Sequence, residues 1–420
     1  MRTTVINQQN SLHKQHNPLA PSPLKEPKNM LVGAGLIGSA VLGSIIVGSE
    51  GSVQGVLFIL GLLLGFTLFH ARFGFTSAFR RLMAVGNGEA LRAHMVMLAV
   101  ATTLFALILS SGLSFTGVTP TGYVSPVGVS LLFGSFIFGI GMQLGNGCAS
   151  GTLYSLGGGS SSMWITLTGF IVGSVVATAH FDFWMNDMPS LPAISLAEST
   201  GLGYLGAWFV QMTIFGLIFL LTIYLQKKKN PPKMKQLPTV QGWKRIFRGS
   251  WPILVAAIVL AVLNAVTLMV RGQPWGITSA FALWGAKVAT AIGIDVTQWS
   301  YWQQDAQAAS LTQSVLADST SVMNFGIMLG AFLASSIAGI FALKKIRPGV
   351  AAASLIGGLM MGYGARLAFG CNIGAYFGGI ASFSLHGWVW MVMAMLGTYL
   401  ALFIRPLFGL SNPKPNDSVC

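Results

Sequence analysis

Two cysteines occupy the same position in two copies of a thirteen-residue motif, and they are the residues of this chain best suited to chemistry. The first copy, GIGMQLGNGCASG, covers residues 139–151, and the second, GYGARLAFGCNIG, covers residues 362–374. A thiol is a weak donor and a polarizable neighbour, so Cys148 and Cys371 suit a soft, sulfur-bearing solute better than a hard oxyanion. The alternative interpretation is that both are small buried hydrophobic residues, as most free cysteines are.

A polar residue stands five positions before each cysteine, Gln143 in the first copy and Arg366 in the second. An arginine within a membrane span is a candidate for a functional site, and its planar fork of donors attracts an anion; the alternative is an arginine that extends to the membrane interface. Donors without nearby carboxylates favour an anion over a cation. Besides these two residues and the cysteines, we predict that a substrate path includes Gly74, Gly276, Thr76, Ser77, Thr278, Ser279, Gly147, Gly370, Asn146 and Asn372.

Other kinds of site have little support in the motifs. The chain contains no CxxC pair and no four-ligand zinc spacing, so we predict no metal site and no cofactor. A cysteine nucleophile needs an activating base, yet neither motif contains a histidine or a carboxylate, and His386 lies fifteen residues after Cys371. We therefore predict no catalytic residues and a protein that is not an enzyme.

The composition predicts the elements that must position these residues. Hydrophobic residues make up 53% of the chain and charged residues only 8%, far below the roughly 25% charge of soluble domains. The 52 glycines favour helices that pack closely in lipid. The net charge of +14 comes from basic residues in loops between apolar spans, which indicates orientation in a lipid bilayer and argues against nucleic-acid binding. The fold class is an all-α integral membrane protein.

A second pair of related segments indicates an internal duplication. GFTSAF at residues 74–79 precedes the first motif, and GITSAF at residues 276–281 precedes the second. Both lie in stretches too short to cross a bilayer, so we expect short re-entrant or half helices. About ten transmembrane helices are predicted, five in each copy. An odd number of spans places consecutive copies in opposite orientations, which gives inverted repeats whose irregular segments meet near the membrane centre.

The apolar runs and the positions of basic residues predict the domain organisation. We expect a flexible tail over residues 1–29, a first membrane repeat over 30–182, an external loop over 183–204, a second membrane repeat over 205–404 with a basic linker at 226–250, and a tail over 405–420. The linker is the most basic stretch of the chain, so it is expected in the cytoplasm together with both termini.

The paired GC motifs with the glycines that follow them, and the FxFTSAFR element at residues 73–80, resemble the YeeE/YedE sulfur-transport family. The resemblance covers residues 31–404. It implies uptake of thiosulfate or a related sulfur compound across the bacterial inner membrane, with cysteines lining a narrow central path; by position, Cys148 and Cys371 are two of them. The chain departs from the family at Gly74, where relatives often carry a further path cysteine.

Two classes of function follow from these expectations. The first is a permease for a small sulfur-containing anion, most simply thiosulfate, captured near the charged second motif and released past Gln143 and Cys148. The short helices after Gly74 and Gly276 contribute N-terminal N–H groups that stabilise negative charge. The alternatives are a membrane sulfur- or selenium-transfer protein, and a channel for another small anion in which the cysteines are structural. No sulfur-carrier domain follows residue 404, so a carrier partner is expected as a separate cytoplasmic protein.

Overall fold

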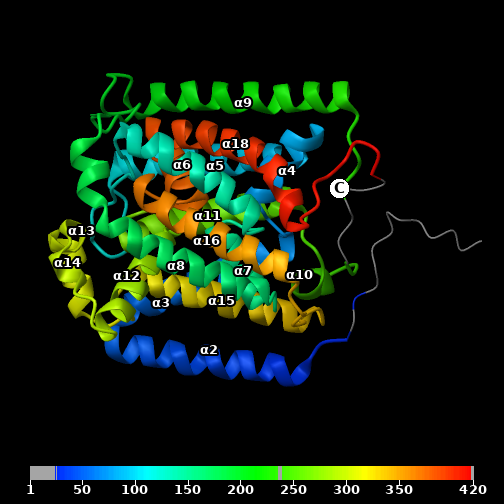
Figure 1. Ribbon diagram of the computed structural model, residues 1–420, viewed down its shortest axis with the longest axis horizontal. Coiled ribbons are helices and arrows are strands. Elements are labelled where there is room, and N and C mark those ends of the chain that lie inside the picture. Colours follow the sequence, from blue (N-terminus) through cyan, green and yellow to red (C-terminus); the bar gives the residue numbers. More distant parts are fainter. Residues whose placement is uncertain (1–23, 25, 235–238, 418–420) are drawn as a thin grey trace, which may run out of the picture.

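The computed structural model describes residues 24, 26–234 and 239–417, and most of that chain is helical. Ten segments of the described chain are long and apolar enough to cross a membrane. In Figure 1 the axes of the long helices are roughly aligned with one another, and α2 and α9 lie at opposite edges of the bundle. The prediction of an all-α integral membrane protein is confirmed. The long helices are α2 (Asn29–Glu50), α3 (Ser52–Ala71), α5 (Glu89–Ser111), α6 (Val129–Leu144), α8 (Ser162–Ala179), α9 (Gly203–Lys229), α11 (Ile253–Arg271), α15 (Ser319–Ile337), α16 (Pro348–Leu367) and α18 (Leu385–Ile404).

Shorter elements connect these helices. The short α-helices are α4 (Phe75–Val85), α7 (Ala149–Gly157), α10 (Lys244–Arg248), α12 (Thr278–Ala291), α13 (Ser300–Gln303), α14 (Asp305–Thr312) and α17 (Gly379–Ala381). The π-helical and 3₁₀ turns are η1 (Phe183–Asp187), η2 (Val296–Gln298), η3 (Asn372–Gly378) and η4 (Arg405–Phe408), and two strands, β1 (Val127–Gly128) and β2 (Ser190–Leu191), pair antiparallel. The two TSAF segments form the short helices α4 and α12, as expected.

The stretch 295–321 contains acidic residues and no basic ones, which predicts an external loop, but it is more ordered than a loop. Residues 295–321 contain η2, α13, α14 and the start of α15. Asp295 accepts a hydrogen bond from the backbone N–H of Thr297 at 3.0 Å, and Asp318 accepts one from Ser321 at 2.8 Å. Such side-chain caps satisfy N–H groups that have no partner within a helix. Acidic residues used as evidence for an external loop therefore also begin helices.

The two halves of the chain pack through matching pairs of helices. Helix α8 of the first half packs on α16 of the second, and in the matching pair α18 of the second half packs on α6 of the first. Likewise, α3 of the first half packs on α15 of the second, and α11 of the second half packs on α5 of the first. The corresponding pairs α3 with α11 and α6 with α16 also contact each other. Each half contributes five of the ten spans, so corresponding helices run in opposite directions, which is the relation expected of inverted repeats.

Glycines allow the closest of these helix contacts. A Cβ atom added to Gly173 on α8 would lie 2.2 Å from the carbonyl oxygen of Leu359 on α16, and one added to Gly362 on α16 would lie 2.1 Å from that of Phe170 on α8. No side chain fits at such distances, so the backbones touch directly. Gly362 is the first residue of the second GC motif, which therefore begins at a helix crossing that fixes its position.

We name the two ends of the bundle by what they carry. The end with α13 and α14 is the loop face, and the end with α10 and the basic C-terminal end of α9 is the linker face (Figure 1). Helix α18 also ends on the linker face, where η4 follows it.

Candidate functional site

Both GC motifs form the same tight turn. The residue two positions before each cysteine adopts a left-handed backbone conformation, with φ of 56° at Asn146 and 57° at Phe369. That conformation is rare for residues other than glycine, most of all for a bulky one such as phenylalanine, and such strain gathers at functional sites. Each cysteine is then extended and immediately precedes a short helix, α7 after Cys148 and η3 after Cys371.

The two thiols lie buried at the meeting point of these short helices. Cys148 and Cys371 are each 1% exposed, and α7 contacts η3. The sulfur of Cys148 lies 3.4 Å from the hydroxyl oxygen of Ser150, and the sulfur of Cys371 accepts a hydrogen bond from the N–H of Ile373 at 3.4 Å. Sequence spacing gave the two thiols equivalent positions in the motifs, and the fold places both in one buried cluster, at the centre where α7 contacts η3.

Polar groups without partners surround this centre. The side chain of Asn372 is fully buried, and neither its nitrogen nor its oxygen has a hydrogen-bond partner in the described chain. The hydroxyl of Thr76 on α4 is also buried and has no hydrogen-bond partner in the described chain. Buried polar groups are normally hydrogen-bonded, so unpaired ones need a reason.

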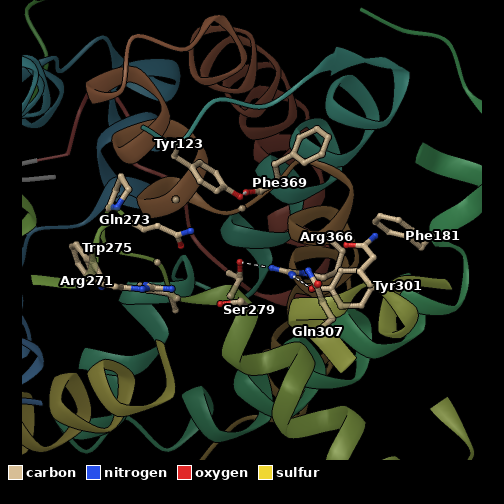
Figure 2. Close-up of a pocket in the computed structure, with 17 residues that line it drawn as sticks. Tyr123, Phe181, Arg271, Gln273, Trp275, Ser279, Tyr301, Gln307, Arg366 and Phe369 are labelled. Atoms are coloured by element: carbon tan, nitrogen blue, oxygen red, sulfur yellow. Dashed lines mark hydrogen bonds between the residues drawn. The ribbon is translucent and has the colours of Figure 1, made fainter. Parts of the chain in front are cut away.

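A cavity of about 390 Å³ opens on the loop face beside the second GC motif, whose Gly370 and Gly374 line it. Its walls come from the turn between α11 and α12, from the end of α16, and from the short helices α13 and α14 (Figure 2). We call it the loop-face pocket. The predicted site residues that line it are Gly276, Thr278, Ser279, Arg366 and Gly370.

Two arginines reach into the loop-face pocket from opposite sides (Figure 2). Arg366 donates hydrogen bonds to the hydroxyls of Thr278 at 2.8 Å and Tyr301 at 3.0 Å, so it is held in the pocket and does not extend to the interface. Its Nε, one terminal nitrogen of Arg271 and the indole nitrogen of Trp275 are buried without a partner in the described chain. No carboxylate lines the pocket. Several unpaired donors and two positive charges give this pocket a chemistry that attracts anions.

Arg271 and Trp275 were not among the residues that the sequence analysis selected. Arg271 ends α11, five residues before the GITSAF segment begins. The sequence did contain a signal for Arg271. Basic residues concentrate in cytoplasmic loops, so an arginine at the opposite end of a span is unusual and is expected to have a binding partner. Nothing in the local sequence distinguishes Trp275 from an aromatic residue at the membrane interface.

A second cavity, of about 520 Å³, opens on the linker face. Gly74 and Ser77 line it, together with three arginines, Arg72, Arg81 and Arg245, and one carboxylate, Glu89. The linker supplies part of its wall, since Met234 accepts a hydrogen bond from Arg81 at 3.0 Å through its sulfur. We call it the linker-face pocket. Residues of the short helix α4 line this pocket on the linker face, and residues of α12 line the loop-face pocket on the opposite face.

A guanidinium also lies beside the first motif, although the motif itself contains no charged residue. Arg80 on α4 lies with its guanidinium 3.3 Å from the side-chain oxygen of Gln143 and 3.4 Å from that of Asn146. The nitrogen of the same Gln143 side chain donates to the carbonyl oxygen of Thr76 at 3.1 Å. Both halves therefore hold a guanidinium near the motif, but in the first half the short helix supplies it and in the second half the motif does.

The end of the chain returns to the first motif. Arg405 is 3% exposed and donates a hydrogen bond to the backbone carbonyl oxygen of Gln143. The same guanidinium also bonds Asn412 at 2.8 Å and the carbonyl oxygen of Ser411 at 2.9 Å. The segment expected as a tail after residue 404 is thus packed, at least to Asn412, against the membrane repeat. Cys420 lies outside the described residues.

These features define a class of protein: a multi-pass membrane protein with a pocket lined by arginines on each face and two buried thiols in its core. The chain belongs to the Sulphur transport family, whose model matches residues 70–400. The resemblance noted from the GC motifs is thereby confirmed, and the protein is a transporter by family.

Three relatives extend this comparison. The chain is 27% identical to the thiosulfate transporter TsuA of Escherichia coli (strain K12) over 369 residues, which cover 83% of this chain and 94% of that protein. It is 25% identical to the thiosulfate transporter TsuA of Spirochaeta thermophila over 363 residues, covering 82% and 97%. It is 31% identical to the probable transporter YedE of Escherichia coli over 161 residues, covering 38% and 39%.

Proposed function

We propose that this protein takes up thiosulfate, or a closely related small sulfur anion, across the bacterial inner membrane. The anion enters the loop-face pocket, where Arg366 and Arg271 neutralise its charge. It then passes between Cys371 and Cys148, and leaves through the linker-face pocket beside Gly74 and Ser77. In this proposal the linker face and both termini lie in the cytoplasm, in agreement with the basic linker.

The observation that supports this proposal most is a pocket with two guanidiniums and no carboxylate beside the second motif. The cysteine of that motif and its counterpart in the first motif are both buried. Thiosulfate combines three anionic oxygens at one end with a soft terminal sulfur at the other. Its oxygens match arginine and hydroxyl donors, whereas its sulfur matches thiols, which interact well with polarizable partners. Two relatives that cover most of this chain are named thiosulfate transporters.

The proposal is tested by uptake of ³⁵S-labelled thiosulfate in cells that lack their other sulfate and thiosulfate importers. Cells that produce the protein should accumulate label with saturation, and unlabelled thiosulfate should compete better than sulfate, which has no soft sulfur atom. Growth on thiosulfate as the sole sulfur source gives a second readout. Absence of uptake with protein present in the membrane would end the substrate assignment.

Two alternatives remain as competing proposals. A membrane sulfur- or selenium-transfer protein would use one thiol as a nucleophile, which requires a base beside it. Within the described chain the recorded hydrogen bonds of Cys148 and Cys371 involve Ser150 and backbone groups, with no imidazole or carboxylate. A channel for another small anion, with structural cysteines, would tolerate removal of both thiols. A separate cytoplasmic sulfur carrier is a proposed partner, recruited on the linker face.

Restoring a thiol at Gly74 is expected to increase thiosulfate uptake. Gly74 has an extended backbone, with φ of −122°, which a cysteine can adopt. A Cβ atom there would lie 2.8 Å from the hydroxyl oxygen of Ser77, so that side chain must move. We expect Gly74→Cys together with Ser77→Ala to raise the initial rate about two- to fivefold. This corresponds to a decrease in the free-energy barrier smaller than the usual contribution of one hydrogen bond.

The matched control for this variant is Gly74→Ala with Ser77→Ala, which carries the same steric change without sulfur. Initial rates of labelled thiosulfate uptake, normalised to protein in the membrane, make the comparison. Equal rates in the cysteine and alanine variants would mean that the absence of a thiol at position 74 does not limit transport.

A further inference from the structure

A third cavity lies on the linker face, apart from the two thiols. It has a volume of about 450 Å³ and opens between the turn that joins α7 to α8 and the loop that joins α15 to α16. Among the residues that line the linker-face pocket, it shares only Arg72. We call it the serine pocket, because Ser155 and the run Ser160–Ser162 line it.

The serine pocket is strongly positive. Arg72, Lys344, Lys345 and Arg347 line it, and no aspartate or glutamate does. In the described chain none of these four side chains has a recorded hydrogen bond or ion pair; the guanidinium of Arg72 lies over the ring of Phe69 at 4.2 Å. All four residues are exposed, so solvent screens the repulsion between them, and an anion bound in the hydroxyl-lined cavity would meet positive charge from several sides.

The glycine- and serine-rich turn adds backbone donors to these charges. Gly159 has φ of 91°, and a Cβ atom there would lie 3.0 Å from the backbone nitrogen of Ala342, so the two loops that form the pocket touch at this glycine. The hydroxyl of Ser161 accepts a hydrogen bond from the backbone N–H of Lys344 at 3.0 Å and does not cap α8. The N–H groups of Met163 and Trp164 donate to the carbonyl oxygens of Ser160 and Ser161, so the N–H of Ser162 is the first of α8 without a backbone acceptor in the described chain, and it could bind an anion.

We propose that the serine pocket binds a phosphate group carried on an organic molecule, either a soluble phosphate ester or the headgroup of an anionic phospholipid. Phosphate oxygens accept several hydrogen bonds at once, which matches hydroxyls, N–H groups and four cations. Met163, Ile340 and Val350 supply an apolar part of the wall, which fits the organic body of an ester. No thiol lines the cavity, so its chemistry differs from that of the thiol pair. The inference does not depend on the proposed transport of thiosulfate.

The test uses the purified full-length protein in detergent and in lipid nanodiscs. Inorganic phosphate and glycerol 3-phosphate are titrated in detergent while thermal unfolding is followed. Native mass spectrometry then compares retention of phosphatidylglycerol with that of phosphatidylcholine. The variants are Lys344→Gln with Arg347→Gln, which removes two charges, and Ser162→Asp, which adds a negative charge to the pocket. The matched control is Lys227→Gln with Lys228→Gln, which removes two exposed charges from the same face outside the pocket.

We expect saturable binding by the wild type, about tenfold weaker binding by both pocket variants, and no more than about a twofold change in the control. Binding of glycerol 3-phosphate assigns the soluble ester, and selective retention of phosphatidylglycerol assigns the headgroup. The inference is overturned if the wild type binds neither ligand, or if the control variant loses as much binding as the pocket variants. Thiosulfate uptake measured on the same variants separates this outcome from failure of the transport proposal.

Discussion

Uptake of thiosulfate is expected to fall by about 30-fold when Cys148 and Cys371 are both replaced by alanine. Each thiol is buried at the start of a short helix, where it can contact a passing anion that has left water. A contact of this kind contributes about 1 kcal/mol, so loss of two raises the barrier by about 2 kcal/mol. Initial rates at low concentrations of labelled thiosulfate measure the effect, and each single variant should show a smaller loss.

Two comparisons distinguish a path thiol from a packing residue. Serine in place of each cysteine keeps the shape and the ability to donate a hydrogen bond but removes the soft sulfur, so the double serine variant should also transport slowly. Cys420→Ala, at the end of the chain, is the control for general effects of losing a cysteine. Wild-type rates in the double alanine variant, with normal amounts in the membrane, would show that the cysteines only pack.

Replacing Arg366 and Arg271 by glutamine is expected to weaken the apparent affinity for thiosulfate by about 100-fold or more. Hydrogen bonds between charged groups are worth about 1.5–3 kcal/mol each, and both guanidiniums face the same pocket. Arg366→Gln also places in the second motif the residue that the first motif has at Gln143. Because capture precedes passage between the thiols, the apparent KM should rise far more than the maximal rate falls.

Lysine variants provide the charge-preserving control for this prediction. Arg366→Lys keeps the positive charge but loses the planar fork that bonds Thr278 and Tyr301, so its affinity should lie between those of the wild type and the glutamine variant. Lys228→Gln removes a charge from the linker face and should leave the apparent KM unchanged. An unaltered apparent KM in the double glutamine variant would contradict capture at the loop-face pocket.

The class of fold could be predicted from the sequence because it depends on long-range averages. Ten apolar runs, the low content of charged residues and the duplicated motifs each independently indicate an all-α membrane protein with two repeats. The ends of the helices are harder to predict. Helix α9 continues to Lys229 because its last turn is basic, and positive charge stabilises the C-terminal end of a helix dipole. The charge of Asp318 indicates an external loop, but its side chain also caps α15.

The candidate site could be predicted only where the repeat marked it. Cys148 and Cys371 stand in equivalent positions of a visible motif, whereas Arg271 and Arg80 have no counterpart in the other half and meet the motifs only through folding. The partner of Gln143 was missed for the same reason, since Arg80 lies 63 residues away along the chain. The roles of the residues chosen from the motifs remain predictions, which the variants described here test.

The contact between Arg405 and the carbonyl oxygen of Gln143 joins residues that are 262 positions apart. A ribosome makes the first GC motif long before it reaches Arg405, so the turn around Cys148 lacks one of its supports while the second half is synthesised. Pairing of α6 with α18 imposes the same delay. The turn around Cys148 therefore reaches its final surroundings only after the last span has docked. Chains that stop before Arg405 should be less stable than the full chain and be degraded by membrane proteases.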